Sequence, residues 1–138
     1  LVAKERGIDV TESFNDREED YQTLIRLSIT TEHQTRDIAG TLFGDNRPRI
    51  VSIKGINMEA EIGPHMLYVT NQDKPGFIGA LGSVLGDAGV NIATFHLGRH
   101  KQEGEAIALI EIDSELSLAT LENVCKLPHV AQVKPLKF

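Results

Sequence analysis

The chain has 138 residues, of which 41% are hydrophobic and 25% are charged, a composition typical of soluble globular proteins. Its net charge of −6 leaves no positive excess for phosphate contacts, which argues against nucleic acid as a partner. No apolar run approaches the roughly 20 residues that cross a bilayer, no secretory signal is visible, and one cysteine, Cys125, cannot form an intrachain disulfide. We therefore expect a cytoplasmic protein without membrane contact.

The N-terminal segment has the pattern of a helix end followed by an exposed loop. Residues 1–7 close on Gly7, the residue type that most often ends a helix. The charged run at 13–20 has no hydrophobic period, which is typical of a solvated loop. Because the sequence opens at Leu1 inside this helical pattern, we expect a piece of a longer polypeptide.

Alternating and β-branched residues then predict an antiparallel meander. Its strands are expected at 24–29, 37–43, 49–55 and 57–62. Turn residues separate them, most clearly at 44–48. Gly63 and Pro64 mark a boundary, so we predict a partial α/β module at 1–63 and a second domain at 64–138.

The second domain has the order strand, helix, strand, strand, helix, strand, with strands predicted at 66–71, 90–99, 105–113 and 130–138. The first helix ends at Gly89 and carries an apolar stripe of Phe77, Leu81, Val84, Leu85 and Ala88. The second begins at a Ser117 cap, ends before Pro128, and presents Leu118, Leu121, Val124 and Cys125 to the core. This order predicts an α+β chain whose C-terminal domain is a ferredoxin-like βαββαβ fold with both helices on one face.

Two features of this domain favour self-association. Apolar residues occupy both faces of the strand at 105–113, and one layer of helices covers only one face, so we expect a homodimer or higher homo-oligomer. Gly79, Gly82 and Gly86 share one flank of the first helix, where interior glycines cost roughly 1 kcal/mol each relative to alanine. We expect this flank to contact another backbone, from the first module or from a partner chain.

The loop between the first strand and the first helix carries the candidate binding residues. Pro75 and Gly76 open the helix, whose free amides attract an anion such as a carboxylate, and Asp73 offers a counter-charge to an ammonium group. Asn71 lies beside them, and Asn91 begins the next strand, whose first residues we expect to return to the same end. The arrangement suits a free amino acid. The alternative is structural, with Asp73 as a helix cap and the asparagines as turn residues.

The run from Met66 to Phe138 resembles ACT domains, and the whole chain resembles the C-terminal regulatory part of long-form D-3-phosphoglycerate dehydrogenases. The motifs that carry the resemblance are Asn71-Gln72-Asp73-Lys74-Pro75-Gly76, Gly89-Val90-Asn91-Ile92-Ala93, and Lys4 to Ile8 followed by the meander. The resemblance implies that residues 1–63 are part of an intervening, allosteric substrate-binding module. It also implies that ACT domains pair side by side and bind L-serine, the feedback inhibitor, at the interface, with Asn91 supplied by the partner chain.

The chain itself shows no catalytic arrangement, and the resemblance implies that NAD binds in a catalytic part that is missing here. His96 and His100 share a strand face but stand about 13 Å apart at 3.3 Å per residue, too far to bind one metal ion directly. Some family members carry an Arg-His pair after the meander glycine for an anion site, whereas Ile56 and Asn57 follow Gly55 here. Two alternatives remain open: an oligomerisation scaffold that binds no ligand, and the regulatory part of an L-serine dehydratase.

Overall fold

The structure is a computed structural model that describes residues 5–11, 24–42, 46–100 and 104–138. Its strands are β1 (Leu24–Thr30), β2 (Thr35–Leu42), β3 (Pro48–Ile53), β4 (Ile56–Glu61), β5 (His65–Gln72), β6 (Ile92–Arg99), β7 (Glu105–Ile112) and β8 (Val130–Lys137). Its helices are α2 (Phe77–Asp87) and α3 (Leu118–Cys125). The loop predicted at 13–20 lies outside the described residues, as do the first four residues of the helix end predicted at 1–7.

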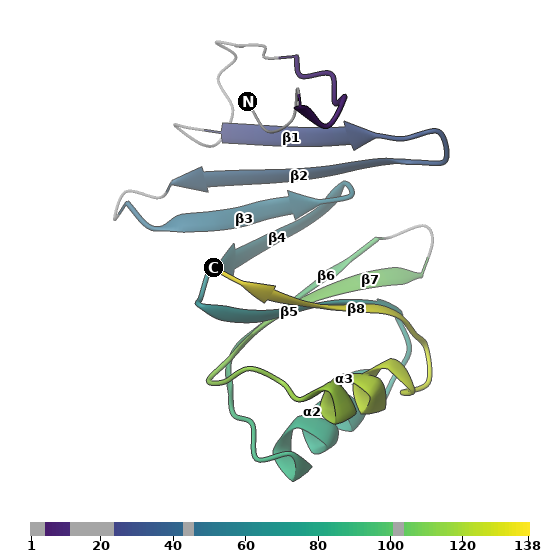
Figure 1. Ribbon diagram of the computed structural model, residues 1–138. Helices are drawn as coiled ribbons and strands as arrows, with labels where there is room; N and C mark the ends of the chain where they lie inside the picture. Colours follow the sequence, from purple (N-terminus) through teal and green to yellow (C-terminus); the bar gives the residue numbers. More distant parts are fainter. Residues whose placement is uncertain (1–4, 12–23, 43–45, 101–103) are drawn as a thin grey trace.

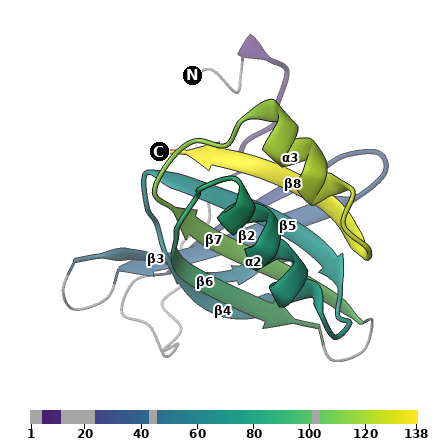
Figure 2. The same ribbon diagram turned by 90° about the horizontal axis from the view of Figure 1, so that it is seen from below.

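The strands form two four-stranded sheets in the orders β1-β2-β3-β4 and β6-β7-β5-β8. In the second sheet β5 pairs antiparallel with β7 and β8, and β7 pairs antiparallel with β6. Both helices cover one face of this sheet, as Figure 2 shows from the helix side. This is the ferredoxin-like arrangement, so the predicted α+β fold class is confirmed. Pro135 lies on the edge strand β8, where a missing backbone donor is tolerated.

The first core lies between the helices and the second sheet. The buried face of α2 consists of Phe77, Leu81 and Leu85, which confirms most of the predicted stripe. They pack against Leu67 and Ile110 of the sheet. Complete burial of one such side chain contributes about 1.5–3 kcal/mol, so this contact holds the helix on the sheet.

The buried face of α3 differs from the predicted one. Ser117 caps the helix as expected, because its Oγ accepts from the Thr120 amide at 3.2 Å. The buried residues are Thr120 and Val124, whereas Leu118 is 80% exposed and Cys125 is exposed. The prediction that Cys125 is a buried hydrophobe was wrong. A hydroxyl contact of 2.9 Å between Ser117 and Thr120 satisfies the threonine, which allows a polar residue to take the inward position.

Strands β3 and β4 of the first sheet pack against the other face of the second sheet, whereas β1 and β2 extend away from it (Figure 1). A second core forms between the sheets, where Ile107 and Leu109 of β7 are fully buried against Ile53, Ile56 and other meander residues. The expectation that this face of β7 is left uncovered was therefore wrong, because meander residues of the same chain pack against it. The homo-oligomer stays a prediction.

Two local features fit the sheets together. The register between β2 and β3 shifts between Ala39 and Gly40, and this bulge helps to bring Ile50 and Ile53 into the same core although they are three residues apart. Gly98 of β6 lies directly against β4. A Cβ at Gly98 would stand 2.5 Å from Ile56 Cγ2 and 3.1 Å from the Asn57 carbonyl oxygen, so only glycine fits there without displacement.

The glycine flank of α2, defined by Gly79, Gly82 and Gly86, contacts neither sheet. A Cβ built on any of the three meets no atom of the described residues within 4 Å. The described part of the first module therefore does not approach this flank, and the predicted contact with a partner chain stays a prediction.

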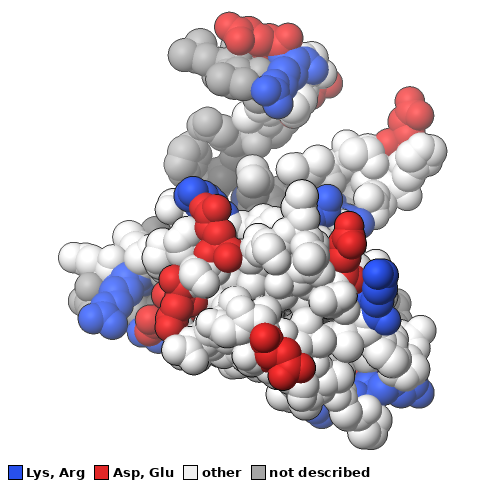
Figure 3. All heavy atoms as spheres, turned by 60° about the horizontal axis from the view of Figure 1, so that its bottom comes forward, with Lys and Arg blue, Asp and Glu red and all other residues white. Residues whose placement is uncertain are grey.

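Figure 3 views the molecule from the helix side, and acidic and basic side chains are interspersed on that face. Such a surface does not build up a strong field of one sign. Neither helix of the described residues is long and apolar enough to cross a membrane.

Candidate functional site

A pocket of about 470 Å³ lies where β5 ends and α2 begins. This volume is within the range of small-molecule sites, roughly 300–1,000 Å³. Its walls come from the end of β5, the following loop, the first turn of α2 and the end of β6. They are lined by Asn71, Asp73, Lys74, Pro75, Gly76, Phe77, Ile78, Gly79, Leu97 and Arg99.

The sheet register brings the polar residues together. Asn71 of β5 and Arg99 of β6 both pair with Ala106 of β7, so the three residues form one row across the sheet. Asp73 follows β5 directly, and its amide donates to the Gly104 carbonyl oxygen at 2.6 Å. This bond fixes the loop against the turn before β7.

Asn71 has a buried acceptor without a donor. Its side chain is 2% exposed, and its Nδ2 donates to the Gln72 carbonyl oxygen at 2.8 Å. Its Oδ1 finds no hydrogen-bond donor among the described residues. A buried polar atom left without a partner costs roughly 1–3 kcal/mol, so this oxygen favours a ligand that donates a hydrogen bond.

Asp73 pairs with Arg99 across the pocket. The distance from Asp73 Oδ2 to Arg99 Nε is 3.4 Å, and the two side chains are 34% and 64% exposed. Sequence reasoning missed Arg99, because its place beside Asp73 follows from strand register and not from proximity along the chain. The pocket thus holds one anionic and one cationic group side by side.

The start of α2 contributes backbone donors. Gly76 is the N-cap residue with φ 92°, in the left-handed region that favours glycine. No side chain of the described residues caps the helix, so Asp73 is not a cap. The sequence had suggested that Pro75 lies in the first turn of the helix. In the structure it precedes the N-cap Gly76 and lies outside that turn. The uncapped amides at this end attract negative charge.

Asn91 lies at the opposite end of the sheet within one chain. It precedes Ile92, which pairs with Ile112, whereas Arg99 pairs with Ala106. Eight residues at roughly 3.3 Å each separate Asn91 from Arg99 by about 26 Å. The expectation that the first residues of β6 return to the loop was wrong, because α2 carries the chain back along the sheet before β6 begins.

The pocket therefore offers the complement of a zwitterion: a carboxylate, a guanidinium, an amide oxygen and helix-terminal amides. Nothing in it forms a nucleophile and base pair. Among residues 5–11, 24–42, 46–100 and 104–138, no group of three or more His, Cys, Asp or Glu side chains is placed to hold a metal ion. The charged and polar groups of the pocket suit binding of a small polar molecule.

A βαββαβ domain with a ligand-sized pocket at its first helix has the architecture of an ACT domain, and the ACT domain family matches residues 65–129. The D-3-phosphoglycerate dehydrogenase intervening domain family matches residues 1–54. The chain therefore carries a D-3-phosphoglycerate dehydrogenase intervening domain followed by an ACT domain.

Curated relatives agree with this assignment. D-3-phosphoglycerate dehydrogenase of Bacillus subtilis is 35% identical over 133 residues, which is 96% of this chain and 25% of the relative. The enzyme of the same name from Synechocystis is 30% identical over 138 residues, all of this chain and 25% of the relative. A probable L-serine dehydratase beta chain of Bacillus subtilis is 23% identical over 132 residues, 96% of this chain and 60% of that relative. The chain thus spans about a quarter of the length of these two dehydrogenases.

Proposed function

We propose that this chain is a regulatory module that binds a small amino acid, L-serine, at an ACT domain interface and thereby exerts feedback control on a D-3-phosphoglycerate dehydrogenase. The observation that carries the proposal is the buried Asn71 Oδ1, which lacks a donor and belongs to a residue that lines the pocket together with the paired Asp73 and Arg99. Serine is the effector that the family resemblance implies.

The bound amino acid replaces the contact between Asp73 and Arg99. Its ammonium group donates to the Asp73 carboxylate and to Asn71 Oδ1. Its carboxylate accepts from the α2 amides beyond Gly76 and from the Arg99 guanidinium. Because the free pocket already holds both charges, the ligand exchanges one ion pair for two and leaves no charge unpaired.

A second copy supplies Asn91. β6 is an edge strand that pairs only with β7 in the second sheet, so its outer edge is free to pair with another strand. In an isologous antiparallel pairing centred on Phe95, Asn91 of one copy stands opposite Arg99 of the other. Asn91 and Arg99, which lie about 26 Å apart within one chain, thus come together between two chains, and the dimer completes the effector site.

In the full-length protein the module controls a catalytic part that binds NAD and acts in the cytoplasm on the serine biosynthetic route. A ligand that touches both copies stabilises the interface geometry in which those contacts form. The coupling free energy of such regulation is typically 1–3 kcal/mol. The domain limits 1–63 and 64–138 belong to this proposal.

Isothermal titration of this chain with L-serine tests the proposal. Wild-type protein should give saturable heat, and Asp73→Ala should weaken binding about 10-fold to 100-fold, because a hydrogen bond to a charged group contributes roughly 1.5–3 kcal/mol. Glu122→Gln, an exposed change on α3, is the matched control and should bind as wild type does. Absence of serine heat in folded wild-type protein would instead support the ligand-free oligomerisation scaffold.

A second candidate is the regulatory part of an L-serine dehydratase, since a chain of that name is among the relatives. The higher identities to the two dehydrogenases favour the first candidate. The full-length gene separates them: a dehydrogenase requires a nucleotide-binding Gly-x-Gly-x-x-Gly motif upstream, and a dehydratase requires cluster-ligand cysteines.

A further inference from the structure

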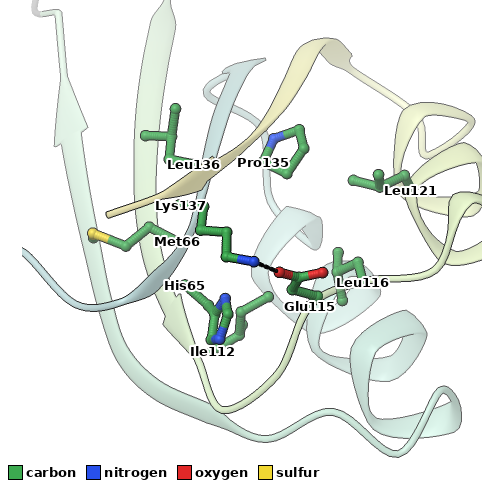
Figure 4. A pocket seen from close by; sticks show the side chains of 9 residues that line it. All are labelled: His65, Met66, Ile112, Glu115, Leu116, Leu121, Pro135, Leu136 and Lys137. Atoms are coloured by element: carbon green, nitrogen blue, oxygen red, sulfur yellow. Dashed lines mark hydrogen bonds and ion pairs between the residues drawn. The ribbon is translucent and has the colours of Figure 1, made fainter.

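A second pocket of about 250 Å³ lies at the other end of the C-terminal domain (Figure 4). It is bordered by the start of β5, the end of β8, the end of β7 and the segment that leads into α3. Its lining residues are His65, Met66, Ile112, Glu115, Leu116, Leu121, Pro135, Leu136 and Lys137. His65 and Asn71 are six residues apart on β5, so about 20 Å separates this pocket from the first one.

Most of the second pocket is apolar. Leu116 and Leu121 pack against the first core, and Met66 and Leu136 belong to the second core, so the pocket opens where the two cores approach the surface. An apolar wall left open to water is unfavourable by roughly 25 cal/mol for each Å² of apolar surface. The pocket therefore suits a ligand with an apolar body.

Charged groups stand at its mouth. Figure 4 shows the Lys137 ammonium meeting the Glu115 carboxylate, with the His65 ring close to both. The hydrogen bond from Lys137, together with its charge, lowers the pKa of Glu115, and the His65 charge acts in the same direction while burial opposes it. Glu115 and Lys137 are 62% and 73% exposed, so solvent screens this ion pair and it adds little to the stability of the fold.

His65 adds a ring nitrogen whose hydrogen-bonding capacity is unused within the described part of the chain. Its Nδ1 is buried and has no hydrogen-bond partner among the described residues. A buried ring nitrogen in the wall of an otherwise apolar pocket costs free energy unless something binds it. The pocket thus combines an apolar wall, a cation, an anion and an unpaired imidazole nitrogen.

We propose that this second pocket binds an α-amino acid with an apolar side chain, of the size of leucine or valine. The ammonium group of the ligand pairs with Glu115, its carboxylate pairs with Lys137 and accepts from His65 Nδ1, and its side chain lies against Leu116 and Leu121. The ligand needs both charged ends, because the mouth of the pocket carries one charge of each sign. It needs an apolar body, because the wall of the pocket carries no charge.

The site is independent of the proposed serine pocket. It lies beside β8, whereas the proposed dimer pairing uses β6 at the other edge of the sheet. One chain is therefore able to hold two amino acids at the same time, one with a polar side chain at the start of α2 and one with an apolar side chain before α3. The chain then reports on more than one amino acid.

Amide-proton NMR titration of the 138-residue chain tests the site. L-Leucine should shift the amide resonances of residues 112–117, 136 and 137 in a saturable manner. Isocaproate, which lacks the ammonium group, and isoamylamine, which lacks the carboxylate, should each bind about tenfold more weakly. Alanine should also bind at least roughly tenfold more weakly, because it has three fewer carbon atoms to bury.

Variants separate the two sites. Glu115→Gln and Lys137→Met should each weaken leucine binding about tenfold and leave serine binding unchanged, whereas Asp73→Asn should do the reverse. Glu122→Gln controls for loss of a surface charge. Equal affinity for leucine and isocaproate would overturn the assignment of Glu115, and an absence of saturable shifts near residues 112–117 would overturn the site, whatever the outcome with serine.

Discussion

Asp73 Oδ2 and Arg99 Nε lie 3.4 Å apart at the ends of two strands that do not pair with each other. The row formed by Asn71, Ala106 and Arg99 explains this proximity. The first pocket therefore already holds, in the free state, the two charges that a zwitterion requires, and the ligand needs only to replace their mutual contact.

Removal of the guanidinium should separate binding from stability. We expect Arg99→Gln to change the free energy of unfolding by less than about 1 kcal/mol, because the ion pair is exposed to solvent. We expect the same change to weaken L-serine binding about tenfold. Urea unfolding and calorimetric titration of one preparation measure both quantities. Unchanged serine affinity in this variant would remove Arg99 from the site.

The proposed pairing of β6 makes a geometric prediction. With Phe95 on the two-fold axis, Thr94 of one copy faces His96 of the other, with a Cα distance of roughly 4.5–5.5 Å that a disulfide can bridge. In a Cys125→Ser background, a mixture of Thr94→Cys and His96→Cys chains should therefore form cross-linked dimers under mild oxidation. Each variant alone places its cysteines on a diagonal of about 7–8 Å and should cross-link more slowly. Equal rates for the mixture and the single variants would contradict this register.

The contact between Gly98 and β4 should not tolerate a side chain. We expect Gly98→Ala to lower the free energy of unfolding by about 1–3 kcal/mol, because the new Cβ would stand 2.5 Å from Ile56 Cγ2. Gly86→Ala is the matched control: its Cβ meets no described atom within 4 Å, so it should stabilise the chain by about 0.5–1 kcal/mol.

A double variant identifies the cause of the Gly98 effect. Ile56→Ala removes the nearest side-chain atom, so its cost and that of Gly98→Ala should combine to less than their sum in urea unfolding. Additive costs would show that the clash is not with Ile56.

Tyr68 should make the fold sensitive to alkali. Burial raises the pKa of Tyr68 above 10.0, with a smaller opposing effect of Arg36 and a smaller supporting effect of Glu105. Because the unfolded chain ionises this tyrosine first, its contribution is fully present below pH 10.0 and is lost as the pH rises above that value. The free energy of unfolding should therefore fall more steeply with alkaline pH in the wild type than in Tyr68→Phe. Identical slopes would contradict this attribution.

The sequence was sufficient to predict most strands to within one or two residues, because alternation and turn residues are local signals. It also predicted Ser117 as a cap and the buried face of α2. It was not sufficient for α3, where Thr120 replaces Leu118 in the core. Inward placement of a threonine depends on the hydroxyl contact with Ser117, which a count of apolar residues does not reveal.

The candidate site divides in the same way. Asn71, Asp73, Pro75 and Gly76 are close in sequence and line one pocket. Arg99 and Asn91 could not be placed, because their positions depend on the register of β6 on β7 and on the length of α2. Burial of Ile107 and Leu109 by the meander was missed for a related reason, since the packing of one sheet on another is not encoded in either strand alone.

The two faces of strand β6 make different contacts. Leu97 and Arg99 on one face line the first pocket, and Gly98 on the other face contacts β4 directly, because it has no side chain. A ligand that displaces the β6 backbone must therefore either push the meander or open a gap beneath it. Only the β6 backbone separates the first pocket from the contact between Gly98 and β4.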